Sequence, residues 1–229
     1  MIWRLKSFLK RYWPSLSLRT ILFGTLLFVA ALPGVGAVGL RVYENTLVQQ
    51  TEAELIAQSA VLASAYRLAW GADPEQRDAA PEPPRIDLSA NPVLPPLPLP
   101  EPAGAPDNRS ADAARKIAPI VDDAAAVTLS DTRLLDARGV IVAGHGDVGL
   151  SYETLPEVQG ALSGHSATVL RRRDSGETSM IDWVSTAAGI RVHHVRPVMV
   201  KGRVVGMVML ARSPRSIFLG IYQDRGKIA

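Results

Sequence analysis

The feature that most constrains this chain is the segment Thr20–Leu40, which contains no charged side chain. At about 1.5 Å per residue, a helix over this segment is roughly 30 Å long, which matches the hydrocarbon core of a bilayer. The residues before it include five basic side chains and no acidic one: Arg4, Lys6, Lys10, Arg11 and Arg19. No second run of this kind follows. The sequence therefore predicts one membrane helix at 20–40 and a large part of the chain on one side of the membrane.

The distribution of basic residues predicts the orientation of that helix. Because positively charged flanks stay in the cytoplasm, residues 1–19 are expected to be cytoplasmic and the rest exported. A cleaved signal peptide is the alternative, since Val35-Gly36-Ala37 has the small residues of a cleavage site. The length of the basic region and of the apolar run favours a retained anchor.

The composition narrows the chemistry of the exported part. The chain has no cysteine, so disulfides and thiolate metal sites are excluded. The formal net charge is +3, but the basic residues up to Arg41 contribute much of it, and the remainder is slightly acidic. We therefore expect no nucleic-acid partner. No cofactor is indicated, and His193 and His194, being adjacent on a predicted strand, point to opposite faces and are not expected to share a metal.

Residues 41–70 are predicted to continue the membrane helix as a stalk. Apolar side chains recur every seven residues along it: Val48, Leu55, Leu62 and Ala69. This narrow stripe has two interpretations, packing on the chain's own domain or pairing with a second copy in a parallel dimer.

The segment 71–110 has a different composition, with ten prolines between Pro81 and Pro106. Proline removes a hydrogen-bond donor and disfavours helix in the residue before it. We expect an extended, flexible spacer here.

The chain from residue 111 to 211 is predicted to form an α+β domain with an antiparallel sheet and short flanking helices. Val204–Leu210 is apolar at almost every position, so this strand should be central and covered on both faces. The expected elements are a helix at 111–126, a hairpin of 133–136 and 140–143, a helix at 154–162, strands at 167–173 and 179–185, and a hairpin of 190–200 and 204–211.

Three stretches of this domain resemble a PAS-like sensor domain of the Cache or PDC type, which bacterial receptors place outside the cytoplasm. They are Asp136-Ala-Arg-Gly-Val-Ile-Val-Ala143, Pro156-Glu-Val-Gln-Gly-Ala-Leu-Ser-Gly164 and Val195–Leu210. The residues 212–229 resemble the approach to a second membrane helix in bacterial two-component sensor histidine kinases. The resemblance covers the topology of 1–40 and the pattern of 111–229.

This resemblance implies the input module of a sensor histidine kinase, in a bacterial inner membrane with the sensor domain in the periplasm. It also implies a homodimer, a small anionic ligand or periplasmic partner protein, and a response regulator contacted only through cytoplasmic domains beyond 229. No catalytic domain is recognised in the chain itself. The input of a chemoreceptor or cyclic-nucleotide enzyme, or a stand-alone anchored binding protein, are the alternatives.

Four basic side chains on predicted strands are the candidate ligand-binding residues. Arg171 and Arg173 share one face of their strand, and His194 and Arg196 share one face of the next. If these faces line a pocket, they could bind a carboxylate through charge-assisted hydrogen bonds. The alternative is that they cover the solvent face of a one-sided sheet.

Overall fold

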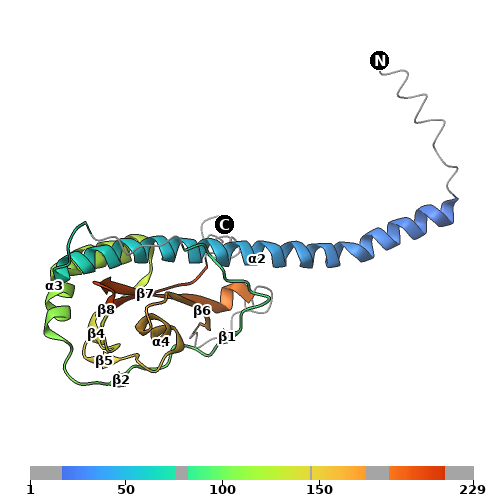
Figure 1. Ribbon diagram of the computed structural model, residues 1–229. Coiled ribbons are helices and arrows are strands. Elements are labelled where there is room, and N and C mark those ends of the chain that lie inside the picture. Colours follow the sequence, from blue (N-terminus) through green and yellow to red (C-terminus); the bar gives the residue numbers. More distant parts are fainter. Residues whose placement is uncertain (1–16, 76–81, 145, 174–185, 215–229) are drawn as a thin grey trace, which may run out of the picture. The chain divides into compact units, whose positions relative to one another are not determined.

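The computed structural model describes residues 17–75, 82–144, 146–173 and 186–214 (Figure 1). The chain divides into two compact units, Met1–Tyr43 and Glu44–Ala229. Helix α2 (Leu18–Trp70) contributes to both of them. The predicted strand at 179–185 and the residues 215–229 of the predicted membrane-proximal segment lie outside the described residues.

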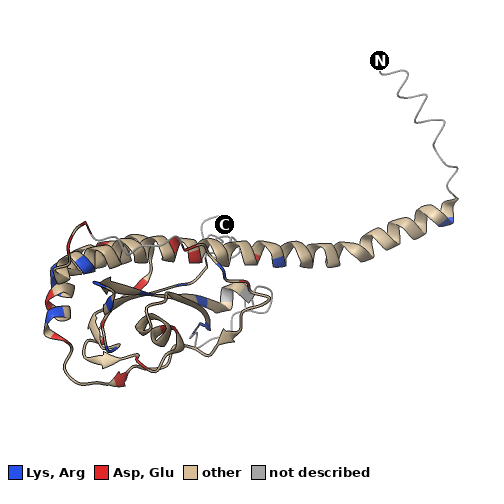
Figure 2. Cartoon of the chain, in the orientation of Figure 1, with Lys and Arg blue, Asp and Glu red and all other residues tan. Residues whose placement is uncertain are grey.

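The first part of α2 is apolar and lies entirely on the surface. Every residue from Leu18 to Gly39 is exposed, and Figure 2 shows this stretch without charged residues beyond the N-terminal end of the helix. Among the described helices, α2 alone is long and apolar enough to cross a membrane. Pro33 lies inside it, as lipid-spanning helices tolerate. The prediction of one long N-terminal helix that could span a membrane is thus supported.

The second part of α2 packs within its own unit. Val48, Leu55 and Leu62 of the seven-residue stripe are buried in one hydrophobic cluster, together with Tyr66. The stripe therefore covers the chain's own sheet, as the first of the two interpretations predicted.

The Glu44–Ala229 unit is α+β, as predicted, with a six-stranded sheet in the order β1-β6-β7-β8-β3-β4. Neighbouring strands are antiparallel except β1 and β6, which are parallel. A second, two-stranded sheet pairs β2 with β5. The strands are β1 (Val93–Leu94), β2 (Glu101–Pro102), β3 (Asp131–Asp136), β4 (Ile141–Ala143), β5 (Leu150–Ser151), β6 (Ala167–Arg172), β7 (Ile190–Val200) and β8 (Arg203–Arg212).

The sheet is covered on both faces, which explains the composition of β8. Val208 and Leu210 belong to the same hydrophobic cluster as α2 and α3 (Asn108–Thr128), whereas Met207 and Met209 belong to the cluster of α4 (Pro156–Leu162). Because side chains alternate along a strand, a strand covered on both sides needs apolar residues throughout. The predictions of a central β8 and of the β3–β4 and β7–β8 hairpins are confirmed.

Part of the proline-rich segment differs from the expected flexible spacer. Val93 and Leu94 pair with Leu170 and Arg171, and Glu101 and Pro102 pair with β5. Helix α3 begins at Asn108, earlier than expected, because the side chain of Asp107 caps it by accepting a 2.8 Å hydrogen bond from the Ser110 backbone N–H. The described residues after Pro81 are therefore tied into the fold at several points.

Candidate binding pocket

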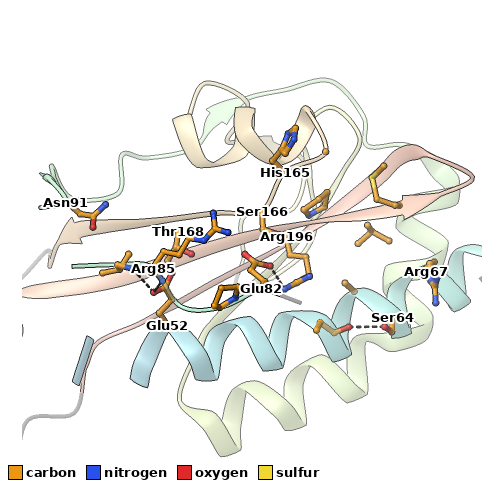
Figure 3. A pocket seen from close by; sticks show the side chains of 18 residues that line it. Glu52, Ser64, Arg67, Glu82, Arg85, Asn91, His165, Ser166, Thr168 and Arg196 are labelled. Carbon is orange, nitrogen blue, oxygen red and sulfur yellow. Dashed lines mark hydrogen bonds and ion pairs between the residues drawn. The ribbon is translucent and has the colours of Figure 1, made fainter. Parts of the chain in front are cut away.

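A pocket of about 640 Å³ lies between α2, the segment 82–91, the turn at 164–166 and strands β6 and β7 (Figure 3). Its volume is in the range of pockets that hold small molecules. The charged residues that line it are Glu52, Arg67, Glu82, Arg85 and Arg196. Hydroxyl groups of Ser64, Ser166 and Thr168 also line it. This combination of guanidinium and hydroxyl groups suits a ligand that accepts hydrogen bonds.

Arg196, on β7, joins three parts of the fold at this pocket. Its Nε donates to Ser59 Oγ on α2 over 2.9 Å, and its Nη2 donates to Glu82 Oε2 over 2.5 Å. The Arg196 side chain is only 12% exposed, so both bonds lie mostly away from water. Ser59 is fully buried and donates its own hydroxyl hydrogen to the Ile56 carbonyl. The Arg196 guanidinium therefore connects the sheet, α2 and the segment 82–91, which forms the proline-rich wall of the pocket.

Side chains of α2 also hold the proline-rich wall of the pocket in place. Glu52 Oε2 accepts hydrogen bonds from the backbone N–H groups of Arg85 and Ile86, both at 2.8 Å. Two turns earlier on α2, Asn45 Oδ1 accepts a hydrogen bond from the Leu88 N–H at 3.0 Å. Glu52 is 3% exposed, and its buried charge is satisfied by these two donors. The wall between Arg85 and Leu88 is thus fixed to the helix.

His194 lies behind the pocket and does not line it. Its ring is fully buried, and Nδ1 is 2.9 Å from Oγ1 of Thr168, which does line the pocket. Burial, together with the smaller effect of the nearby Arg196 charge, lowers the pKa of His194 to about 3, so the ring is neutral at pH 7. His194 therefore positions a hydroxyl group and adds no charge to the site.

Arg171 lies on the opposite face of the sheet. Its Nε and Nη2 donate to the two carboxylate oxygens of Glu157 on α4, at 2.8 and 2.9 Å. Its Nη1 donates to the Pro95 carbonyl at 3.3 Å. Both side chains of this bidentate pair are almost completely buried. Arg171 thus fastens α4 and the proline-rich segment to β6 and does not reach the pocket.

The four predicted site residues therefore do not converge. The register places Thr168 opposite His194 and Arg171 opposite Arg191, so Arg171 and His194 belong to different faces. Arg196 lines the pocket, and His194 supports it from behind. Arg173 is exposed, one residue beyond β6, where its backbone N–H donates to the Gly189 carbonyl.

Sequence reasoning missed Ser59, Glu82 and Thr168 as neighbours of Arg196. Ser59 carried a signal, because it is a polar residue between Leu55 and Leu62 of the buried stripe. Glu82 carried none, since it is one acid in a proline-rich segment.

Comparisons with known proteins add no identification. No protein-family model matches the chain, and no match is found among curated proteins. Within the described residues, no group of three or more His, Asp or Glu side chains is placed to hold a metal ion. The function of the chain is therefore inferred from the geometry of the pocket.

Proposed function

We propose that this chain is the extracytoplasmic sensing module of a bacterial transmembrane sensor histidine kinase. The observation that carries the proposal is the bond between Arg196 and Ser59, because Ser59 belongs to the same helix as the membrane-length apolar segment. Within 111–211 the strands of the six-stranded sheet pair antiparallel and helices cover both faces, which supports the proposed PAS-like resemblance. The hydrogen bond from Arg196 to Ser59 joins a charged group of the pocket to α2.

The apolar surface and the basic flank support a retained anchor with a cytoplasmic N-terminus. The most apolar stretch of α2 has no residue buried in the protein, so bilayer lipid is the environment in which its surface is stable. The positive charges before it favour the cytoplasmic side for residues 1–19 and the periplasm for the sensor part. The membrane is then the bacterial inner membrane.

A binding event at the pocket would act on α2 as a bias between two states. An anion on Arg196 alters the group that Ser59 contacts, and a small shift or rotation of α2 follows if the two states bind the ligand differently. In the intact receptor this shift would change autophosphorylation of a cytoplasmic histidine and transfer to a response regulator. Such receptors act as homodimers, and the exposed Val61 and Leu68, seven residues apart on α2, offer apolar surface for a second copy.

Two measurements test the proposal. Alkaline phosphatase fused after Arg212 should be active in cells, and a fluorescent protein that matures only in the cytoplasm should be dark at the same position. Purified intact receptor should incorporate labelled phosphate from ATP, and Arg196→Gln should change that rate. An inactive phosphatase fusion overturns the orientation. A methyl-accepting or cyclase domain in the reading frame beyond Ala229 overturns the kinase output and favours the alternative receptor classes.

A further inference from the structure

Arg196 already holds a carboxylate in this pocket, and that carboxylate belongs to the chain itself. Glu82 Oε2 lies 2.5 Å from Arg196 Nη2, and the Glu82 side chain is 24% exposed. Among the described residues, Glu82 makes no other hydrogen bond or ion pair with its side chain. Within the part of the chain that the structure describes, Arg196 is therefore the group that holds the Glu82 side chain at the pocket.

From this arrangement we infer that the pocket binds a small carboxylate ligand, and that Glu82 is a tethered competitor which the ligand displaces from Arg196. The inference rests on the proposed function in that it treats the pocket as the sensing site. It narrows the small anion that the resemblance implies to a carboxylate, and it adds that Glu82 competes with this ligand for Arg196.

The chemistry of the pocket favours a carboxylate. A guanidinium presents its N–H donors as a planar fork that matches two carboxylate oxygens, and Glu82 demonstrates that one such oxygen fits at Nη2. Thr168 on the neighbouring strand β6 and Ser166 in the turn before it line the same pocket and present hydroxyl groups to the rest of a small ligand. Arg85 is exposed and adds a second guanidinium at the rim. This set of guanidinium and hydroxyl groups favours a small mono- or dicarboxylate.

The exchange is energetically feasible because a ligand carboxylate replaces the Glu82 carboxylate at Arg196. Displacing Glu82 removes one carboxylate from Arg196 and supplies another, so the guanidinium never loses its counter-charge. A carboxylate tethered by a short chain competes at an effective concentration on the order of millimolar. The ligand must exceed that competition, so Glu82 sets the concentration at which the pocket responds.

The hydrogen bonds that hold the segment 82–91 on α2 determine which part of it would be released when a ligand displaces Glu82. Glu52 holds the N–H groups of Arg85 and Ile86 and is almost completely buried, so this part stays on α2. Pro83 and Pro84 are exposed, and Glu82 precedes them. Ligand binding would therefore free the chain at Glu82 and leave it fastened from Arg85 onward, while the Arg196 bond to Ser59 persists.

The test is calorimetric titration of the full chain in detergent with acetate, succinate and citrate at pH 7.5 and constant ionic strength. Glu82→Gln should bind at least one of these probes about tenfold more tightly than the wild type, because the internal competitor has lost its charge. Glu82→Asp, with a shorter arm, should shift in the same direction. Arg196→Gln should abolish binding, and Glu101→Gln, an exposed glutamate outside the pocket, should match the wild type.

Unchanged or weaker binding by both Glu82 variants overturns the inference, as does the absence of binding of all three probes to the wild type and to Glu82→Gln. Circular dichroism of each variant checks that it is folded. These outcomes are independent of the orientation and phosphorylation measurements. A gain of affinity in Glu82→Gln would stand even if the output domain proved to be a different one.

Discussion

Gly206 on β8 lies directly against the ring of Tyr66 on α2. A Cβ atom at position 206 would come within 2.6 Å of Tyr66 Cε1 and 2.7 Å of the Leu135 carbonyl oxygen. Tyr66 is fully buried, and its hydroxyl is 3.4 Å from the carbonyl oxygens of Ser110 and Leu135. The long helix can therefore approach the sheet here only because residue 206 has no side chain.

Gly206→Ala is expected to destabilise the fold by roughly 1–3 kcal/mol, since a packed core has no room for the added methyl group. Urea unfolding followed by circular dichroism measures the change. Gly104→Ala is the matched control, because a Cβ atom there meets nothing within 4 Å. Equal stability of the two variants would show that both Tyr66 and the Leu135 carbonyl can move aside at no cost.

Glu157→Gln should destabilise the protein by about 3–5 kcal/mol, because it leaves the Arg171 guanidinium buried without its counter-charge. The exposed Glu153→Gln on the same connection should change stability by less than about 0.5 kcal/mol. The double variant Glu157→Leu, Arg171→Met should be more stable than Glu157→Gln if the buried charge is the cause. Urea midpoints of the four proteins decide this. A Glu157→Gln protein as stable as Glu153→Gln would contradict the assignment.

Stability should fall as the pH drops below about 6.5, because two histidines are neutral in the folded protein. Burial, assisted by Arg191 and Arg171, lowers the pKa of His193 to about 3, and burial lowers that of His194 to the same value. Between pH 6.5 and 3 the unfolded chain binds protons that the folded chain does not, so stability rises with pH in this window. Each histidine contributes a slope of up to about 1.4 kcal/mol per pH unit.

Urea midpoints measured between pH 7.5 and 4.5 give this slope. His194→Gln should reduce it by about half, whereas His165→Gln, which replaces an exposed histidine, should leave it unchanged. A wild-type stability that is flat across this range would show that the folded protein protonates both rings without cost.

Ser59→Ala should weaken carboxylate binding about five- to tenfold, because Arg196 Nε loses the acceptor that orients it, a loss of about 1 kcal/mol. Calorimetric titration with the probe that binds the wild type most tightly measures this. Gln50→Ala, on an exposed position of the same helix, is the control. In the intact receptor, Ser59→Ala should also reduce the phosphorylation response at saturating ligand. A full phosphorylation response in the Ser59→Ala receptor would show that the pocket does not signal through the Arg196–Ser59 contact.

Much of the local structure could be predicted from side-chain periodicity. Thr20–Leu40 is apolar over a membrane length, and the seven-residue spacing of Val48, Leu55 and Leu62 marks the buried side of α2. The apolar run Val204–Leu210 and the glycine at 202 predicted a central hairpin, and in the structure Gly202 adopts φ 74° between β7 and β8. These properties depend on neighbouring residues, so they can be read from the chain itself.

The face of the sheet on which each basic residue lies, and the partner that it binds, depend on the tertiary structure. Whether Arg171 and His194 share a face depends on the pairing register of β6 and β7, and a shift of one residue would reverse it. Arg171 binds Glu157, 14 residues away, but Arg196 binds Glu82, 114 residues away. Such partners depend on how the whole chain packs, because no local pattern encodes which distant carboxylate a buried guanidinium will meet. The long helix, most strands and the candidate basic residues follow from local sequence pattern, whereas the packing of the sheet on α2 leaves Arg196 as the one predicted site residue that lines the pocket.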